Sequence, residues 1–149
     1  MPRVDDILAC LARAKYISVI DLSSGFHHLE IVKENRCKTA FNTPWGLWQF
    51  TRMPFGVING PGKFQRAIDD ILGDFKWDFV IAYVDDLIVY SETLELHMKH
   101  IELLFQTLEK NHIKLNPEKI HFFRNKVNYL GFVIENSICS PDPEKPKAL

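Results

Sequence analysis

Residues 79–90 constrain the fold most, because ten of them are apolar or aromatic and the other two, Asp85 and Asp86, are adjacent acids. Runs of β-branched and aromatic residues of this length are typical of two buried strands, here joined at the acidic pair. Two ionised carboxylates against such a surface are costly unless a cation, a partner or a pKa shift relieves them. A solvated hairpin tip is the alternative, but tight turns favour Asn-Gly or Asp-Gly because both central positions need positive φ. The stretch therefore favours a metal-binding turn.

Composition indicates one globular domain. The chain has 149 residues, of which 46% are apolar and 12% aromatic, enough for a substantial core. It has no apolar run of about 18 residues and no signal-peptide pattern, so neither a membrane nor a secretory route is expected. Three widely spaced cysteines fit a reduced intracellular compartment better than a disulfide framework or a zinc site. The net charge of −1 argues mildly against a nucleic-acid enzyme.

Hydrophobic periodicity predicts an α+β fold. The expected elements are helices at about residues 4–14, 61–73 and 93–111, strands at 16–20, 27–32, 37–41 and 47–50, the strand pair within 79–90, and a last hairpin at 127–134. Antiparallel strands mixed with helices in this order indicate a split βαβ, ferredoxin-like sheet backed by helices. Residues 140–149 are rich in proline and charge, which is typical of an extended linker.

A third acid, Asp21, ends the apolar strand that begins at residue 16. A helix N-cap is the ordinary use of Asp at such a position. In a split βαβ sheet, however, the central strands can be neighbours, which would bring Asp21 beside Asp85 although 64 residues separate them. Carboxylates at one sheet edge suit a pair of Mg²⁺ ions about 3.5–4 Å apart, so the pattern predicts a phosphoryl-transfer site.

Four stretches resemble successive motifs of reverse transcriptases, most closely those of the Pol polyprotein of gypsy-class LTR retrotransposons. They are Ile-Asp-Leu-Ser-Ser-Gly-Phe-His at 20–27, Met-Pro-Phe-Gly-Val with Asn-Gly-Pro and Phe-Gln within 53–65, Tyr-Val-Asp-Asp at 83–86, and Tyr-Leu-Gly at 129–131. The resemblance implies a polymerase palm with a small β-rich fingers remnant over residues 1–139, and a linker towards a thumb over 140–149. It implies an RNA-directed DNA polymerase that extends a primer from dNTPs on an RNA or DNA template.

The same resemblance assigns catalytic roles. Asp21 and Asp85 would hold two Mg²⁺ ions, for which Mn²⁺ is a possible substitute, and the carbonyl of Leu22 would add a ligand. Asp86 would support the metal site from the neighbouring strand position, since adjacent strand side chains diverge. Lys119 lies near the family's motif-D lysine, a proton donor to the leaving pyrophosphate.

Further roles concern the nucleotide and the primer. Phe26 matches the steric gate that selects deoxynucleotides, with an ordinary core phenylalanine as the alternative. Phe55, Gly56 and Gln65 match the segment that borders the incoming nucleotide and the template. The primer grip would be formed by Tyr129, Leu130 and Gly131.

The sequence also departs from the family pattern. Gly60 and Gly62 stand where the family commonly has helix-favouring residues, which weakens the helix start by roughly 1 kcal/mol each. The basic fingers residues, the thumb and the RNase H and integrase regions are expected from the rest of Pol, or from a dimer partner, so the isolated chain is expected to be inactive. The expected location is intracellular, in the cytoplasm or a virus-like particle. The alternatives are a decayed or domesticated palm acting only as a folded binding module, and a two-metal nuclease or cyclase, in which Phe26 and the primer-grip match would have no purpose.

Overall fold

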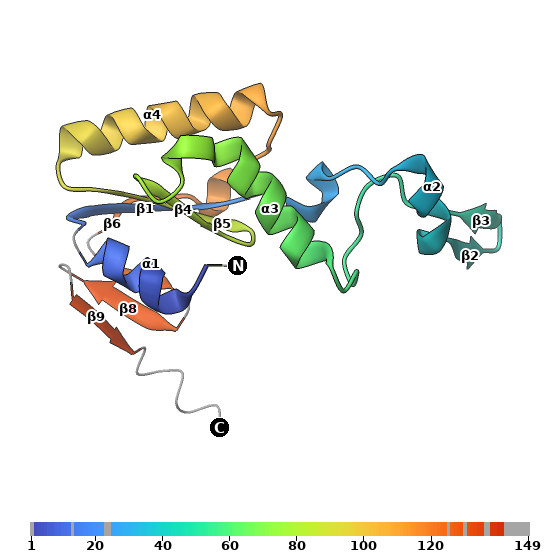
Figure 1. The fold of residues 1–149 in the computed structure, drawn as a ribbon, viewed down its shortest axis with the longest axis horizontal. Helices are drawn as coiled ribbons and strands as arrows, with labels where there is room; N and C mark the ends of the chain where they lie inside the picture. Colours follow the sequence, from blue (N-terminus) through green and yellow to red (C-terminus); the bar gives the residue numbers. More distant parts are fainter. Residues whose placement is uncertain are drawn as a thin grey trace.

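An antiparallel four-stranded sheet forms the centre of the molecule (Figure 1). This computed structural model describes residues 2–12, 14–22, 25–124, 126–129, 131–135 and 138–141. The strands are β1 (Tyr16–Asp21), β4 (Val80–Tyr83), β5 (Asp86–Ser91) and β6 (His121–Arg124), in the order β4-β5-β1-β6. The first strand of the chain therefore lies next to the strand that begins with Asp86, as the split βαβ prediction requires.

Other elements pack on both faces of the sheet, over strands β1, β4 and β5, whereas the residues of the edge strand β6 are exposed. Helices α3 (Gly60–Leu72) and α4 (Leu94–Lys110) pack on one face (Figure 1). The other face carries helix α1 (Val4–Leu11) and a second antiparallel sheet of β7 (Lys126–Tyr129), β8 (Phe132–Glu135) and β9 (Ile138–Pro141). This layering explains why strands β4 and β5 are almost entirely apolar, because residues on both of their sides must be buried.

Alternate residues of the central strands enter two separate cores. Val80 and Val89 pack with α3 and α4, whereas Ile81 and Ile88 pack with α1 and β7–β8. Such alternation follows from the period of two in a strand. The same parity places the side chain of Asp86 on the face that carries Ile88.

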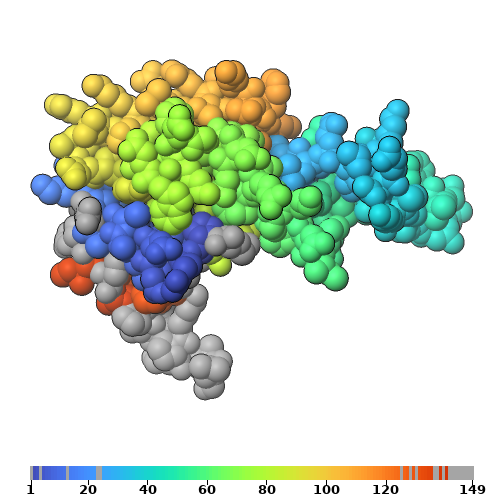
Figure 2. Space-filling model, viewed as in Figure 1, coloured from blue at the N-terminus to red at the C-terminus, as the bar shows by residue number. Residues whose placement is uncertain are grey.

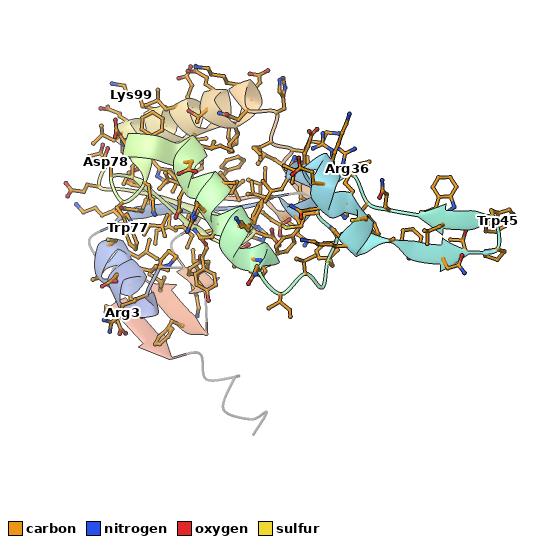
Figure 3. The ribbon with its side chains drawn as sticks, turned by 45° about the vertical axis from the view of Figure 1, so that its right-hand side comes forward. Arg3, Arg36, Trp45, Trp77, Asp78 and Lys99 are labelled. Atoms are coloured by element: carbon orange, nitrogen blue, oxygen red, sulfur yellow. The ribbon has the colours of Figure 1, made fainter. Side chains whose placement is uncertain are left out.

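An arm projects from this body (Figures 1 and 2). The chain leaves β1 through a 3₁₀ turn, η1 (Gly25–His28), and continues into α2 (Lys33–Arg36) and η2 (Cys37–Thr39). The arm ends in a two-stranded ribbon of β2 (Phe41–Thr43) and β3 (Gly46–Trp48), with Trp45 at its tip (Figure 3). Its large apolar side chains are exposed, and Trp45 is 85% accessible.

The sequence prediction was wrong for most of this arm. Of the predicted strand at 27–32, residues 27 and 28 lie in η1 and Glu30 forms an isolated bridge with Arg52. The predicted strand at 37–41 begins as the 3₁₀ turn η2, and residues 33–36 between the two segments form helix α2. Residues 29–31 do run beside 51–53, with bonds from Ile31 N to Thr51 O of 2.9 Å and from Met53 N to Leu29 O of 2.9 Å. Short apolar runs carry little periodicity, so neighbouring segments decided their conformation.

The prediction also missed strands β6 and β9. Residues 140 and 141 lie in β9, and the rest of the expected linker, 142–149, lies outside the described residues. Cys10 and Cys37 are free thiols. Within the described ranges, none of the helices combines the length and apolarity needed to cross a bilayer.

Candidate active site

The structure brings the predicted acids together at one edge of the central sheet. Strands β1 and β5 pair with Asp21 opposite Asp86. One residue further, the backbone N–H of Leu22 donates to the carbonyl of Asp85 over 2.8 Å. Two segments far apart in the sequence thus meet, as predicted, although the direct cross-strand partner of Asp21 is Asp86 rather than Asp85.

The turn between β4 and β5 lies one residue earlier than the sequence suggested. Tyr83 pairs with Asp86, so the two turn residues are Val84 and Asp85. Val84 has a φ of 53°, in the left-handed region that a β-branched residue rarely adopts. A positive φ at the first central position normally calls for glycine, so this turn is strained by about 1–3 kcal/mol.

The acids repel one another in a partly desolvated setting. Burial, followed by the charge of Asp21, raises the pKa of the Asp85 carboxyl, and Lys119 partly opposes that rise. The pKa of Asp86 is likewise raised, first by burial and then by Asp21 and Asp85. Asp85 Oδ1 is buried and has no hydrogen-bond partner among the described residues. Such an orphaned carboxylate oxygen calls for a partner that the polypeptide does not supply.

Lys119 places a positive charge beside Asp21. It ends the 3₁₀ turn η4 (Pro117–Lys119), and its Nζ lies 3.4 Å from Asp21 Oδ2. The bond from Asn116 N to the carbonyl of Asp21, 3.1 Å long, holds this turn beside β1. The Lys119 side chain is 64% exposed, so it can swing away from Asp21 at little cost.

Gly25 leaves the space that Asp85 occupies. A Cβ built on Gly25 would overlap Asp85 Oδ1 and would lie 2.6 Å from Phe64 Cζ. The carboxylate therefore approaches the backbone of η1 more closely than any other residue at position 25 would allow. The turn after β1 and helix α3 together enclose one oxygen of Asp85.

The donor set fits a hard divalent cation. The pKa values of Asp85 and Asp86 are raised, and Asp85 Oδ1 is buried without a partner among the described residues. A bound Mg²⁺ would stabilise the ionised carboxylates and would give that oxygen a partner. In the described part of the chain, no three or more His, Cys, Asp and Glu side chains are grouped closely enough to form a metal cage. Mg²⁺ seldom needs one, because it is usually held by one or two carboxylates together with water and substrate phosphates.

Three phenylalanines, Phe26, Phe55 and Phe64, pack together where the arm leaves the central sheet. The ring of Phe26 packs edge-on against Phe55 and at a tilt of 47° against Phe64, with a centroid distance of 5.4 Å in each pair. Phe55 is largely exposed, and Gly56 follows it with a φ of 87°. Beside them is a hollow of about 420 Å³, lined by His27, Lys38, Thr39, Phe50, Pro54, Phe55, Gly56 and Val57.

Gln65 does not lie where a nucleotide could touch it, which corrects the sequence interpretation. Its side chain is buried, with 3% exposed, and its amide bonds to Asp69 and to the backbone of β4 and the turn. A buried amide whose hydrogen-bonding groups are already in use positions the backbone and cannot also read a ligand.

The primer-grip assignment also needs correction in one respect. The side chain of Tyr129 is 4% exposed and packs in the core with α1, so the ring cannot face a primer. Burial raises the pKa of its hydroxyl, and the charge of Asp86 adds to the rise. Gly131 has a φ of 85° at the bend between β7 and β8, and Leu130 lies outside the described residues. Any primer contact from this hairpin would come from the bend and its backbone.

The sequence matches the protein family described as "Reverse transcriptase (RNA-dependent DNA polymerase)" over residues 2–134. The chain belongs to the reverse transcriptase family. The motif-based resemblance is therefore confirmed.

Curated reverse transcriptase relatives come from mobile elements. The chain is 39% identical to the Retrovirus-related Pol polyprotein from transposon opus of Drosophila melanogaster, over 100% of this chain and 15% of that protein. It is 38% identical to the corresponding polyprotein from transposon gypsy of the same species, again over 100% of this chain and 14% of the relative. The Transposon Tf2-3 polyprotein of Schizosaccharomyces pombe is 29% identical over 97% of this chain and 11% of its own length. The chain thus spans a small part of these relatives.

Solved structures share the fold. The foamy viral protease-reverse transcriptase in complex with RNA/DNA hybrid matches with a TM-score of 0.82 and 33% identity, over 94% of this chain and 19% of that one. The same viral protein in complex with dsDNA matches with a TM-score of 0.81 and 30% identity, over 96% and 31% of the two chains. The predicted α+β, palm-like class is confirmed.

A buried polar network joins helix α4 to strands β1 and β5, and the reverse transcriptase motifs do not predict it. His97 of α4 is fully buried, with Nε2 2.8 Å from Ser18 Oγ of β1 and Nδ1 2.9 Å from Ser91 Oγ of β5. Ser91 Oγ lies 2.8 Å from His100 Nδ1, and Phe123 N of β6 donates to Ser18 Oγ over 3.1 Å. Burial, and then the nearby His100, lower the pKa of His97 to about 4. The signal in the sequence that could have predicted this network is the pair of serines, Ser18 and Ser91, within otherwise apolar strands.

Proposed function

We propose that this chain is the palm, with part of the fingers, of an RNA-directed DNA polymerase that extends a primer by two-metal nucleotidyl transfer from dNTPs. One observation carries the proposal: Asp21, Asp85 and Asp86 meet at one sheet edge, with a buried, unpartnered oxygen on Asp85. The reverse transcriptase family membership supplies the reaction class. The assignment of residues 1–139 to palm and fingers and of 140–149 to a linker remains part of the proposal.

The carboxylates of Asp21 and Asp85, with the carbonyl of Leu22, would hold the Mg²⁺ ions, and Asp86 would add charge from the neighbouring position. When bound, these ions lower the pKa of the primer 3′-hydroxyl and neutralise the triphosphate and the leaving pyrophosphate. Mn²⁺, which also accepts carboxylate oxygens, is the expected substitute.

The remaining residues act on the substrate directly. Lys119 Nζ lies 3.4 Å from Asp21 Oδ2 on an exposed side chain, a suitable place from which to donate a proton to pyrophosphate. Phe26 packs against Phe55 and Phe64 and directly follows Gly25, whose backbone Asp85 approaches closely, so its firmly held ring would exclude a 2′-hydroxyl. Phe55 and Gly56, next to the hollow at the base of the arm, would border the nucleotide and the template.

The template-primer is the proposed partner. The solved relatives are complexes with RNA/DNA hybrid and with dsDNA, which supports a nucleic acid as the partner. The net charge of −1 implies that other parts of Pol, or a partner chain, would provide the basic contacts. An intracellular location, in the cytoplasm or a virus-like particle, remains a prediction.

A chimera tests the proposal. Residues 2–134 would replace the matching segment of an active gypsy-class reverse transcriptase, and Mg²⁺-dependent dNTP incorporation would be measured on an RNA template with a DNA primer. We expect incorporation by the chimera, its loss by at least about a hundredfold in Asp85→Asn, and almost none from the 149 residues alone. A chimera that folds with unchanged stability but incorporates nothing would favour the non-catalytic binding module instead.

A further inference from the structure

We propose that Gln65 is a positioning residue for the metal site: its side-chain amide fixes the strained turn at Val84 and thereby holds the Asp85 carboxylate in place. The inference rests on the proposed function of Asp85. It gives Gln65 a role in place of the nucleotide contact that the sequence suggested.

The turn needs an external restraint. Val84 holds a φ of 53°, and a β-branched residue keeps such a conformation only when its surroundings enforce it. On the other side of the turn, the carbonyl of Asp85 accepts from Leu22 N over 2.8 Å. That bond fixes the C-terminal half of the turn to β1 and leaves the N-terminal half to be held from elsewhere.

Gln65 holds the N-terminal half. Val84 N donates to Gln65 Oε1 over 3.0 Å, and Gln65 Nε2 donates to the carbonyl of Ala82 over 2.9 Å. Nε2 also donates to Asp69 Oδ1, again over 2.9 Å. Nε2 faces two acceptors and Oε1 faces one donor, so the amide has a single favourable orientation. A flipped amide would place its oxygen against the two acceptors and its NH₂ group against the N–H of Val84.

Helix α3 anchors this amide firmly. Asp69 lies one helical turn after Gln65, and its other oxygen, Oδ2, is 2.7 Å from Lys76 Nζ. The preceding residue, Phe64, is fully buried and is one of the two groups that a Cβ on Gly25 would strike, the other being Asp85 Oδ1. Consecutive residues of one helix therefore bound the Asp85 carboxylate and restrain the backbone that carries it.

Two consequences distinguish positioning from mere stabilisation. Loss of the Gln65 amide should weaken metal binding although Gln65 is no ligand. Glycine at position 84, which tolerates positive φ without restraint, should restore metal binding when the amide is absent.

The test measures Mn²⁺ affinity of the 149-residue chain by electron paramagnetic resonance of the free ion, with unfolding followed in parallel by circular dichroism. Asp85→Asn defines the affinity without the site. We expect Gln65→Leu to weaken Mn²⁺ binding about tenfold, equivalent to one hydrogen bond of about 1.4 kcal/mol. Gln106→Leu, at an exposed glutamine of α4, is the matched control and should leave the affinity unchanged. Val84→Gly added to Gln65→Leu should recover most of the lost affinity.

Each outcome has a definite meaning. If Gln65→Leu loses stability but binds Mn²⁺ as tightly as the wild type, Gln65 is only structural and the inference fails. If the wild type binds no better than Asp85→Asn, the proposed metal site itself is wrong. Should Gln65→Leu not fold, Lys76→Met loosens the anchor from the surface, and an affinity equal to the wild type there would count against the inference.

Discussion

The buried histidine of α4 predicts a specific loss of stability in mild acid. The pKa of His97 is about 4 in the folded chain against 6.5 for an unperturbed histidine. Between these two pKa values, His97 is protonated in the unfolded chain but neutral in the folded chain. The contribution of His97 to the free energy of unfolding is therefore complete above about pH 6.5 and is lost as the pH falls towards 4. For one group with these values, the free energy of unfolding drops by about 2 kcal/mol between about pH 7 and pH 5.

The hydrogen bonds explain why His97 stays neutral. Phe123 N donates to Ser18 Oγ, whose hydroxyl can then donate to His97 Nε2. On the other side, His97 Nδ1 can donate to Ser91 Oγ, and that hydroxyl to His100 Nδ1. A proton added at Nε2 would reverse the first bond and leave the Ser18 hydroxyl hydrogen without this acceptor, in a place that water does not reach.

Urea unfolding at a series of pH values, followed by circular dichroism, measures the effect. His97→Gln should be less stable than the wild type at pH 7. Below about pH 6.5, its free energy of unfolding should fall less steeply with decreasing pH, by up to 1.4 kcal/mol per pH unit. Asp85 and Asp86, whose raised pKa values stabilise the fold on acidification, act in both proteins and cancel in the difference. His121→Gln, at an exposed histidine of β6, is the control. Parallel curves for the wild type and His97→Gln would refute the reasoning.

Four further predictions concern the acidic edge and the phenylalanine beside it. Gly25→Ala should destabilise the chain by about 1–3 kcal/mol and weaken Mn²⁺ binding, as urea and metal titrations would reveal, because the new methyl group overlaps Asp85 and Phe64; unchanged values would contradict the close approach. Asp85→Asn should raise the melting temperature without metal at pH 7, since the pKa of Asp85 is raised and its ionised form costs stability, and the gain should vanish below about pH 4. Added Mg²⁺ should raise the melting temperature of the wild type more than that of Asp85→Asn. In the active chimera, Phe26→Ala should admit ribonucleotides, measured as the ratio of rNTP to dNTP incorporation; an unchanged ratio would remove the steric-gate role.

The sequence predicted strands β1, β4 and β5 of the central sheet, and the position of their acids, because these signals are physically strong; the exposed edge strand β6 was missed. Strands β4 and β5 are apolar on both faces, and α4 keeps its helical period over Leu94–Lys110, so local preference and burial agree. Once these elements are in place, the topology alone brings Asp21 beside the β4–β5 turn.

The positioning contacts could not be read in the same way. Gln65 resembles any polar residue in the first turns of a helix, and only the structure reveals that Val84 N faces it. Ser18 and His97 are 79 positions apart, and no local rule pairs them. In the arm, strands as short as Phe41–Thr43 are below the length at which periodicity distinguishes strand from turn.

The exposed arm offers a surface through which molecules of this chain can associate. An isolated two-stranded ribbon is marginally stable in water, and this one presents free backbone edges beside Trp45, Leu47 and Trp48. At the concentrations that spectroscopy requires, neighbouring molecules would associate ribbon to ribbon and mask changes at the acidic edge. Replacing Trp45 and Leu47 with lysine would keep molecules apart by charge repulsion while leaving the distant sheet edge untouched.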